Sequence, residues 1–141
     1  MLAPLIVVIV GVTGFILGQA ILKFVLEPIV EQRKLIGEIA AALTEYANVG
    51  GIRIPEDADR VNKTQTAIRG MASRLRASPW TLPFYEFFAS RQWVKTKDIT
   101  LKASAAMIGW SNTLSGDLGD MGKKDEIAEL LGIDFRTGAR I

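Results

Sequence analysis

The sequence predicts an all-α protein, in which a single N-terminal transmembrane helix continues, with a kink near Pro28, into a small cytoplasmic bundle of about four helices. Three observations favour this fold class. An uncharged apolar run opens the chain, apolar residues then recur at helical steps of three, four and seven, and no segment alternates for long enough to build a sheet. We expect an anchor at residues 1–27, a helical domain at 28–133 and a frayed tail at 134–141.

The opening run, from Leu2 to Leu22, contains no charged residue and is interrupted only by Thr13 and Gln19. As a helix it would reach roughly 30 Å, which is the thickness of the hydrocarbon core of a bilayer. A secretory signal peptide is the alternative, but that peptide begins with basic residues, whereas here the first base is Lys23, after the run. The sequence therefore favours an uncleaved membrane anchor.

The basic residues around this run are asymmetric. None precedes it, whereas Lys23, Arg33 and Lys34 follow it closely. Because basic residues flank transmembrane helices mainly on the cytoplasmic side, the pattern predicts a single-pass protein of the cell membrane whose C-terminal domain faces the cytoplasm.

Small residues lie on one side of the predicted anchor. Gly11, Gly14 and Gly18 share a broad helix face on which a second backbone can approach closely, and Gln19 beside it can hydrogen-bond across a helix pair. This face predicts a helix–helix interface in the membrane, either with another copy of the chain or with another membrane-protein subunit. The alternative is that glycine is simply frequent in membrane helices.

Beyond the run, we expect a second amphipathic helix that ends at about Ala47. Pro28 lacks an amide donor and crowds the preceding turn, so it should bend or break the helix. Polar residues, including Gln32, are expected largely off the apolar stripe. The stripe consists of Leu22, Leu26, Ile29, Ile36, Ile39, Leu43 and Tyr46.

Residues 48–55 are predicted to form a loop, and Glu56 and Asp57 to begin the next helix with acids at its positive end. We expect this helix to end near Ser78, because Pro79 disfavours helical geometry at the residue before it. Its apolar stripe consists of Val61, Thr64, Ile68, Met71 and Leu75.

The stretch from Trp80 to Trp93 holds six of the eleven aromatic residues in the chain. Pro83 is well placed to open a short helix. In that helix Phe84, Phe87 and Phe88 would share one face, either as the core of the bundle, as a contact with the membrane interface or as a groove for a protein partner.

A further helix is predicted from Lys97 or Asp98 to Leu114. Residues 115–122 then break the pattern, and a last helix from Lys124 to Leu131 ends at Gly132, a typical C-terminal cap. The apolar seam of the first of these helices consists of Ile99, Ala103, Ala106, Met107, Trp110 and Leu114.

Basic residues concentrate in the middle of the chain. Residues 58–102 hold nine bases and three acids, whereas the flanking segments 23–57 and 103–141 each hold four bases and six acids. Basic side chains near an anionic leaflet each contribute about 1 kcal/mol of attraction. The predicted site of partner or lipid contact therefore combines aromatic and basic residues: Trp80, Phe84, Tyr85, Phe87, Phe88, Arg91, Trp93, Lys95 and Lys97.

The chain contains neither cysteine nor histidine, which excludes thiolate nucleophiles and removes the commonest general base and metal ligand. We therefore expect no catalytic activity, cofactor or metal, and the lack of any recognised motif disfavours nucleic acid as a partner. The sequence favours a membrane-anchored interaction protein, a subunit, adaptor or scaffold. The first alternative is a membrane-surface effector that binds or perturbs anionic lipid. The second is an enzyme on a membrane-proximal substrate, with Ser111, Asn112 or Ser115 as candidates.

Overall fold

The computed structural model describes residues 2–46, 58–114 and 121–134, all of which lie in helices or in the turns that join them. The prediction of an all-α fold is confirmed for these residues. The predicted loop at 48–55, most of the glycine-rich break and the tail after Asp134 lie outside them. The helical elements are α1 (Leu2–Ile21), the π-helical turn η1 (Leu22–Leu26), α2 (Glu27–Glu45), α3 (Ala58–Thr81), α4 (Tyr85–Ser90), α5 (Lys97–Thr113) and α6 (Met121–Leu131).

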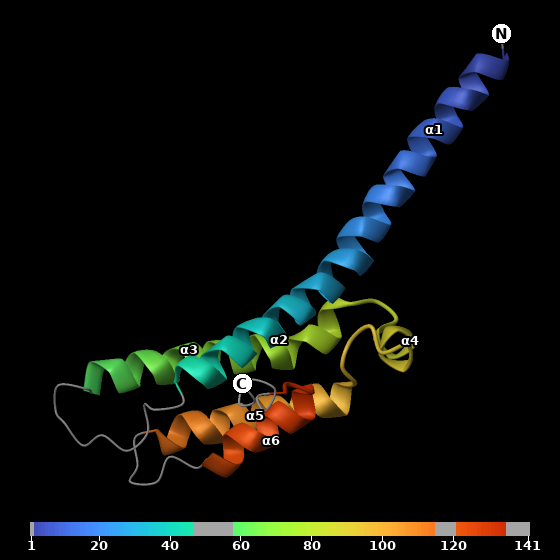
Figure 1. Cartoon of the computed structure of the whole chain (residues 1–141). Coiled ribbons are helices and arrows are strands. Elements are labelled where there is room, and N and C mark those ends of the chain that lie inside the picture. The colour runs from blue at the N-terminus through green and yellow to red at the C-terminus, as the bar shows by residue number, and fades with distance from the viewer. Residues whose placement is uncertain (1, 47–57, 115–120, 135–141) are drawn as a thin grey trace, which may run out of the picture.

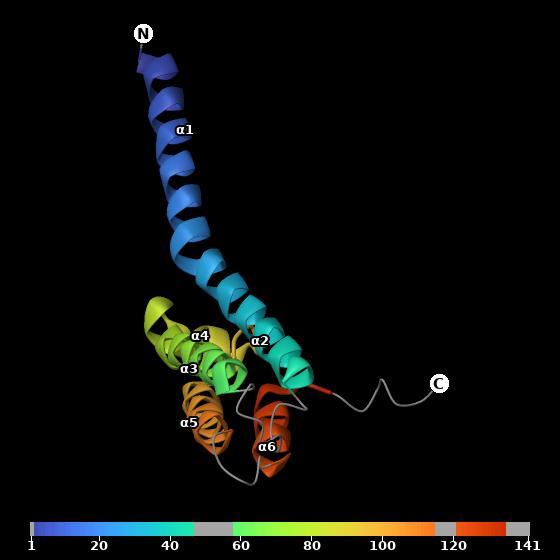
Figure 2. The ribbon, with the colours of Figure 1, turned by 90° about the vertical axis from the view of Figure 1, so that its left-hand side faces the viewer.

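The bundle consists of two layers, with α2 and α3 packed over α5 and α6, while α1 projects away from it (Figures 1 and 2). One large apolar cluster joins all four of these helices, and we call it the main core. Because most of its members recur at helical spacing, each helix contributes one face to it. The buried members are Leu35, Ile39, Leu43, Ile68, Ala72, Leu75, Ala103, Ala106, Met107, Trp110, Leu114, Ile127 and Leu131.

A single helical path runs from Leu2 to Glu45, and it changes direction at η1, as Figure 2 shows. Within this turn the amide of Glu27 donates to the carbonyl of Leu22, five residues earlier. Pro28, which follows at once, has no amide to donate and would crowd the preceding turn of a regular α-helix. The wider π-turn absorbs that mismatch, so the bend expected near Pro28 lies just before it and the helix does not break.

α3 does not end near Ser78, as we expected from Pro79, but continues through the proline to Thr81. Pro79 cannot donate to the carbonyl of Leu75, four residues earlier. The hydroxyl of Ser78 donates to that carbonyl instead, at 2.8 Å. The helix therefore continues because the orphaned acceptor is satisfied locally, and Pro79 itself is buried in the last turn.

The buried face of α2 includes three residues outside the predicted stripe. Gln32, which we expected off the stripe, is buried, as is Ala42, and Leu35 joins the main core. Gln32 lies three residues after Ile29 and four before Ile36, so helical spacing does place it on the buried face. Leu26 belongs to the predicted stripe but is 46 % exposed.

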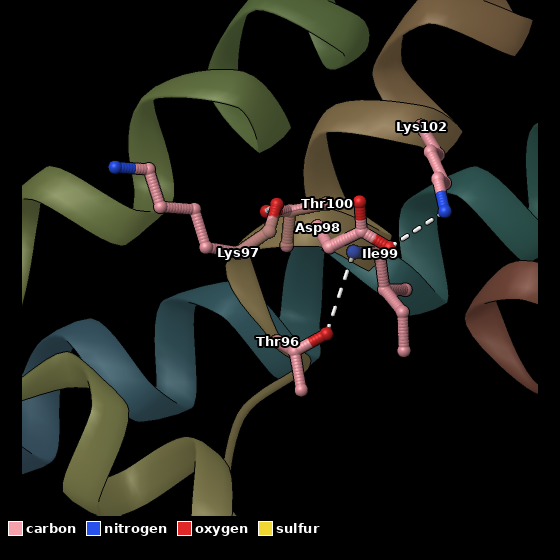
Figure 3. Close-up of polar contacts among 6 residues, drawn as sticks. All are labelled: Thr96, Lys97, Asp98, Ile99, Thr100 and Lys102. Atoms are coloured by element: carbon pink, nitrogen blue, oxygen red, sulfur yellow. Dashed lines mark hydrogen bonds and ion pairs between the residues drawn. The ribbon is translucent and has the colours of Figure 1, made fainter.

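α5 begins and packs as predicted. Thr96 caps it, with its hydroxyl accepting the amide of Ile99 at 3.4 Å, and Asp98 pairs with Lys102 at 2.8 Å one turn later (Figure 3). Five of the six predicted seam residues are buried and Ile99 is half-buried. Thr100, Ser104 and Ser111 are also buried. Their side chains are small, so they leave room for α3 and α5 to pack together.

α6 begins at Met121, three residues before the predicted start, and ends as predicted. Gly132 adopts a left-handed backbone with φ of 68°. Its amide donates to the carbonyl of Glu129, and the amide of Ile133 donates to that of Ala128. These two bonds form the capping motif that the Gly132–Ile133 pair predicted.

Candidate interaction site

Two residues with unusual backbone angles bracket α4. Phe84 precedes it with φ of 55° and Gln92 follows it with φ of 60°, and these are the non-glycine residues of the described chain with positive φ. The left-handed region costs a residue with a side chain about 1–2 kcal/mol. At Gln92 the cost is offset by a complete C-terminal cap, in which the amide of Trp93 donates to the carbonyl of Phe88 and their two rings lie 5.7 Å apart.

The buried side of α4 faces the beginning of α2. Tyr85 and Ala89 are 7 % and 6 % exposed and pack with Ile29, Leu82 and Val94 in a second cluster, which we call the minor core. Val25 of η1 and Phe88 pack against its edge. The minor core therefore lies directly below the junction of α1 and α2, as the position of α4 in Figure 1 also shows.

The proposed face of Phe84, Phe87 and Phe88 does not form the core of the bundle. Phe84 is 83 % exposed and Phe87 57 % exposed, whereas Phe88 is half-buried. The helix begins at Tyr85 and not directly behind Pro83, because Pro83 and Phe84 form a turn. Phe84 therefore lies outside the helix, and within the helix Tyr85 and Ala89, four residues apart, share the buried face.

A buried polar network fixes α4 against α2. The amide nitrogen of Gln32 donates to the Ser78 hydroxyl at 2.8 Å and to the Tyr85 hydroxyl at 3.0 Å, while its oxygen accepts the backbone amide of Lys95 at 2.9 Å. Tyr85 in turn donates to the carbonyl of Lys95. Because every member is paired, the network orients four segments of the chain in the minor core.

Burial raises the pKa of Tyr85 above its usual value, although hydrogen bonds from Gln32 and Thr100 partly oppose the shift. A buried phenol resists deprotonation because its anion would lose hydration. Tyr85 therefore remains a neutral donor to Lys95 at physiological pH. Sequence reasoning assigned Tyr85 to the contact surface and missed Gln32 and Ser78. The position of Gln32 on the apolar stripe of α2 was the signal that could have revealed it.

Four aromatic rings of the predicted site point outward. Trp80, Phe84, Phe87 and Trp93 are all about half exposed or more, and we call these four residues the aromatic patch. Two cations accompany them: Lys97 Nζ lies 4.7 Å from the centre of the Trp80 ring, and the Arg91 guanidinium carbon lies 5.6 Å from that of Phe87. The structure thus places two of the predicted basic residues over exposed rings of the predicted site.

Lys95, also a predicted contact residue, is half-buried and has a structural role. Its backbone holds Gln32 and Tyr85, and its side chain reaches the end of α6, where a Cβ atom built on Gly132 would lie 3.1 Å from Lys95 Nζ. An ammonium group at this helix end complements the negative pole of the helix dipole. Lys95 therefore ties the minor core to α6.

A groove of about 610 Å³ lies between α2 and the chain that follows α4. Arg33 crosses one side of it and donates to the carbonyl of Trp93 at 3.2 Å. The remaining wall is formed by apolar and polar side chains in equal number. The lining residues are Gln32, Arg33, Ile36, Ala89, Ser90, Gln92, Trp93, Val94, Lys95, Thr96 and Ile99.

The glycine face of α1 is uncovered. A Cβ atom built on Gly11, Gly14 or Gly18 would meet nothing within 4 Å, and Gln19 is exposed. No residue of α1 is buried among those that the structure describes. Within the chain, the glycine face is therefore open to a second helix.

Two candidates for an enzymatic role, Ser111 and Asn112, connect α5 to α3. Arg69 donates to the Ser111 hydroxyl at 3.3 Å and to the Asn112 side-chain oxygen at 2.8 Å. Gln65 donates to the carbonyl of Ser111 at 2.9 Å. These bonds satisfy polar groups near the end of α5. Ser115, the third candidate, lies outside the described residues.

No family model, curated protein or solved structure matches this chain.

Proposed function

We propose that this chain is a single-pass membrane protein that acts through protein contacts, as a subunit, adaptor or scaffold of a membrane complex. One observation carries the proposal. The described residues include one helix long and apolar enough to cross a membrane, and its most apolar window is entirely exposed within the chain. No described residue of the bundle covers that surface, so the bilayer is the environment that suits it.

Exposure of this apolar surface to water would cost a large free energy. Thirteen Leu, Ile, Val and Phe side chains between Leu2 and Leu22 are more than half exposed. Transfer of each from water to an apolar medium contributes about 1.5–3 kcal/mol. Because these side chains are 52–75 % exposed, the sum is about 12–24 kcal/mol. This is as large as or larger than the net stability of a small domain, which is about 5–15 kcal/mol. A bilayer removes this penalty, and the basic residues that follow α1 favour a cytoplasmic position for the bundle.

The helical path through η1 supports a role beyond tethering. α2 contributes Leu35, Ile39 and Leu43 to the main core and Ile29 to the minor core. A partner that binds α1 in the membrane would therefore also fix the position of the bundle, since no described loop separates them. This arrangement suits a subunit whose domain must be held at a defined place.

The glycine face of α1 is the proposed site of pairing with a second copy. Because the chain contains no cysteine, single-cysteine variants report proximity without background. Gly14→Cys and Gly18→Cys are expected to form disulfide-linked dimers in native membranes on mild oxidation, because a disulfide requires Cβ atoms about 4 Å apart. Ile9→Cys and Ile16→Cys, on the opposite face, serve as the matched controls and are expected to remain monomeric.

A substitution pair tests the same interface without cross-linking. Gly14→Leu with Gly18→Leu is expected to abolish dimers, because the added side chains separate the two backbones. Thr13→Leu with Ala20→Leu adds similar bulk to the other face and should leave them intact. Equal cross-linking around the helix, or dimers that survive the glycine substitutions, would contradict pairing through this face.

A further inference from the structure

The aromatic patch is unusual in its composition and exposure. Outside the apolar run, Phe24, Leu26 and Val30, every exposed large hydrophobic residue of the described chain belongs to it. Elsewhere in the bundle such side chains are buried or half-buried. A concentration of four exposed rings in one short segment indicates a contact surface, since isolated exposed apolar residues are scattered on most proteins.

The position of α4 favours lipid as the partner. α4 packs on Val25 and Ile29, which lie about 5 and 10 Å along the helix beyond Leu22, the end of the apolar run. If α1 spans a bilayer, residues at this distance beyond the hydrocarbon core lie in the headgroup layer, where interfacial helices place their apolar faces. Figure 1 shows α4 at the end of the bundle nearest α1.

The backbone holds the patch outward. Phe84 adopts a left-handed conformation that a phenylalanine rarely adopts, and yet its ring makes little contact with the rest of the chain, being 83 % exposed. Strain of this kind persists where the surrounding structure imposes it, and it is concentrated at binding sites. The turn at Phe84 and the cap at Gln92 therefore leave large rings exposed, although those of Phe87 and Trp93 each keep a contact with the ring of the half-buried Phe88.

The charges beside the patch favour an anionic leaflet. Lys97 and Arg91 lie over the rings of Trp80 and Phe87, and Glu86 is the single acid between Trp80 and Lys97. Tryptophan rings prefer the interface because they combine an apolar surface with a polar N–H group, and neighbouring cations attract lipid phosphates. A protein groove would also accept aromatic residues, but it would not require α4, which carries Phe87, to pack beside Val25 at the end of the apolar run.

We propose that the aromatic patch inserts into the interfacial layer of an anionic leaflet and that Arg91 and Lys97 contact lipid phosphates. This second membrane contact fixes the bundle in one orientation against the bilayer. The proposal rests on the proposed membrane span of α1, which is tested separately by retention of the chain in membranes washed with alkaline carbonate.

Tryptophan fluorescence of the full chain in vesicles tests the contact. The chain has three tryptophans, and Trp110 is buried in the main core at 1 % exposure. The variant Trp80→Phe with Trp93→Phe therefore provides the baseline. In vesicles of phosphatidylcholine and phosphatidylglycerol, lipids brominated near the headgroup should quench Trp80 and Trp93 more than lipids brominated deep in the chain, and should not quench Trp110.

Two double variants separate the insertion of the rings into the leaflet from the attraction of the basic side chains to lipid phosphates. Phe84→Ser with Phe87→Ser is expected to lower quenching of Trp80 and Trp93 in all vesicles. Arg91→Gln with Lys97→Gln should lower it only where phosphatidylglycerol is present. Arg60→Gln with Lys63→Gln is the control. It removes the same charge from the other end of α3, where Arg60 lies about 30 Å along the helix from Trp80, and it should leave the quenching unchanged.

The outcomes distinguish the two proposals. If carbonate releases the chain from membranes, the proposed span fails and the lipid contact fails with it. If the chain is retained but Trp80 and Trp93 are quenched no more than Trp110, the span stands and the lipid contact is wrong. If neither the pair Phe84→Ser with Phe87→Ser nor the pair Arg91→Gln with Lys97→Gln lowers the quenching, the assignment of these residues to the lipid contact is also wrong.

Discussion

The main core and the minor core use apolar residues in opposite ways. In the main core Ile68, Leu75, Met107 and Ile127 are fully buried, and the helices around them have regular backbones. Around the minor core, five buried residues are held by a polar network, two residues have left-handed backbones, and four large aromatic rings remain exposed. The first arrangement maximises burial, whereas the second keeps apolar surface available for contact.

This difference suggests how a small domain can combine stability with binding. Apolar contacts in the main core stabilise the bundle through burial alone. The minor core relies more on hydrogen bonds through Gln32 and Tyr85, which fix geometry more than they add net stability. Three substitutions, ordered by expected effect, test whether the two regions differ in this way.

The largest effect is expected from Leu75→Ala, which removes a side chain with 0 % exposure from the main core. Such truncations destabilise proteins by about 2–5 kcal/mol, because contacts are lost and a cavity remains. Chemical unfolding of the full chain in detergent micelles measures the change, with Trp80→Phe and Trp93→Phe present in all samples so that the emission comes from the buried Trp110. Arg60→Ala, at an exposed position, is the control and should shift stability by less than about 0.5 kcal/mol. A small effect at Leu75 would contradict the view of a tightly packed main core.

An intermediate and local effect is expected from Gln32→Leu, which leaves the backbone amide of Lys95 without its acceptor and the Tyr85 hydroxyl with only its bond to the Lys95 carbonyl. Each unsatisfied buried group costs about 1–3 kcal/mol. We expect amides of α4 to exchange with solvent about 10–100-fold faster, since 1.4 kcal/mol is a factor of ten, while those of α5 change little.

Gln65→Leu is the matched control for this experiment, because it removes a glutamine that bonds to Ser111, away from α4. Its effect is expected near the end of α5. If exchange is accelerated equally throughout α3, α4 and α5 in the Gln32 variant, the two cores unfold as one unit and do not differ in the way proposed.

The smallest effect, and one of opposite sign, is expected from Phe84→Gly. Glycine adopts positive φ without steric cost, and the ring that it removes is mostly exposed. We expect stabilisation by about 0.5–1 kcal/mol in the micelle unfolding assay. The same variant should weaken the proposed lipid contact, so that stability and membrane quenching change in opposite directions. A loss of stability would mean that the Phe84 ring contributes to packing in the chain.

Much of the fold was predictable because its determinants are local. Apolar spacing located the face of α5 that carries Met107 and Trp110, and the Gly132–Ile133 pair located the end of α6. The candidate site was predictable in composition, since aromatic and basic residues adjoin one another in the sequence. Its geometry was not, because the inward position of Tyr85 depends on contacts with Ile29 and Gln32 of α2, and the outward position of Phe84 depends on the turn that it forms.

By itself, the sequence determined the apolar run, the helical fold and the residue types of the aromatic patch, since these follow from hydropathy and from spacing along one chain. Only the tertiary structure decided three further features. Ser78 allows α3 to pass Pro79, η1 carries the helix past Pro28, and Gln32 joins segments 46 to 63 residues apart. These features depend on hydrogen bonds or backbone adjustments that no periodicity encodes, and in the last case the partners meet only after the chain has folded.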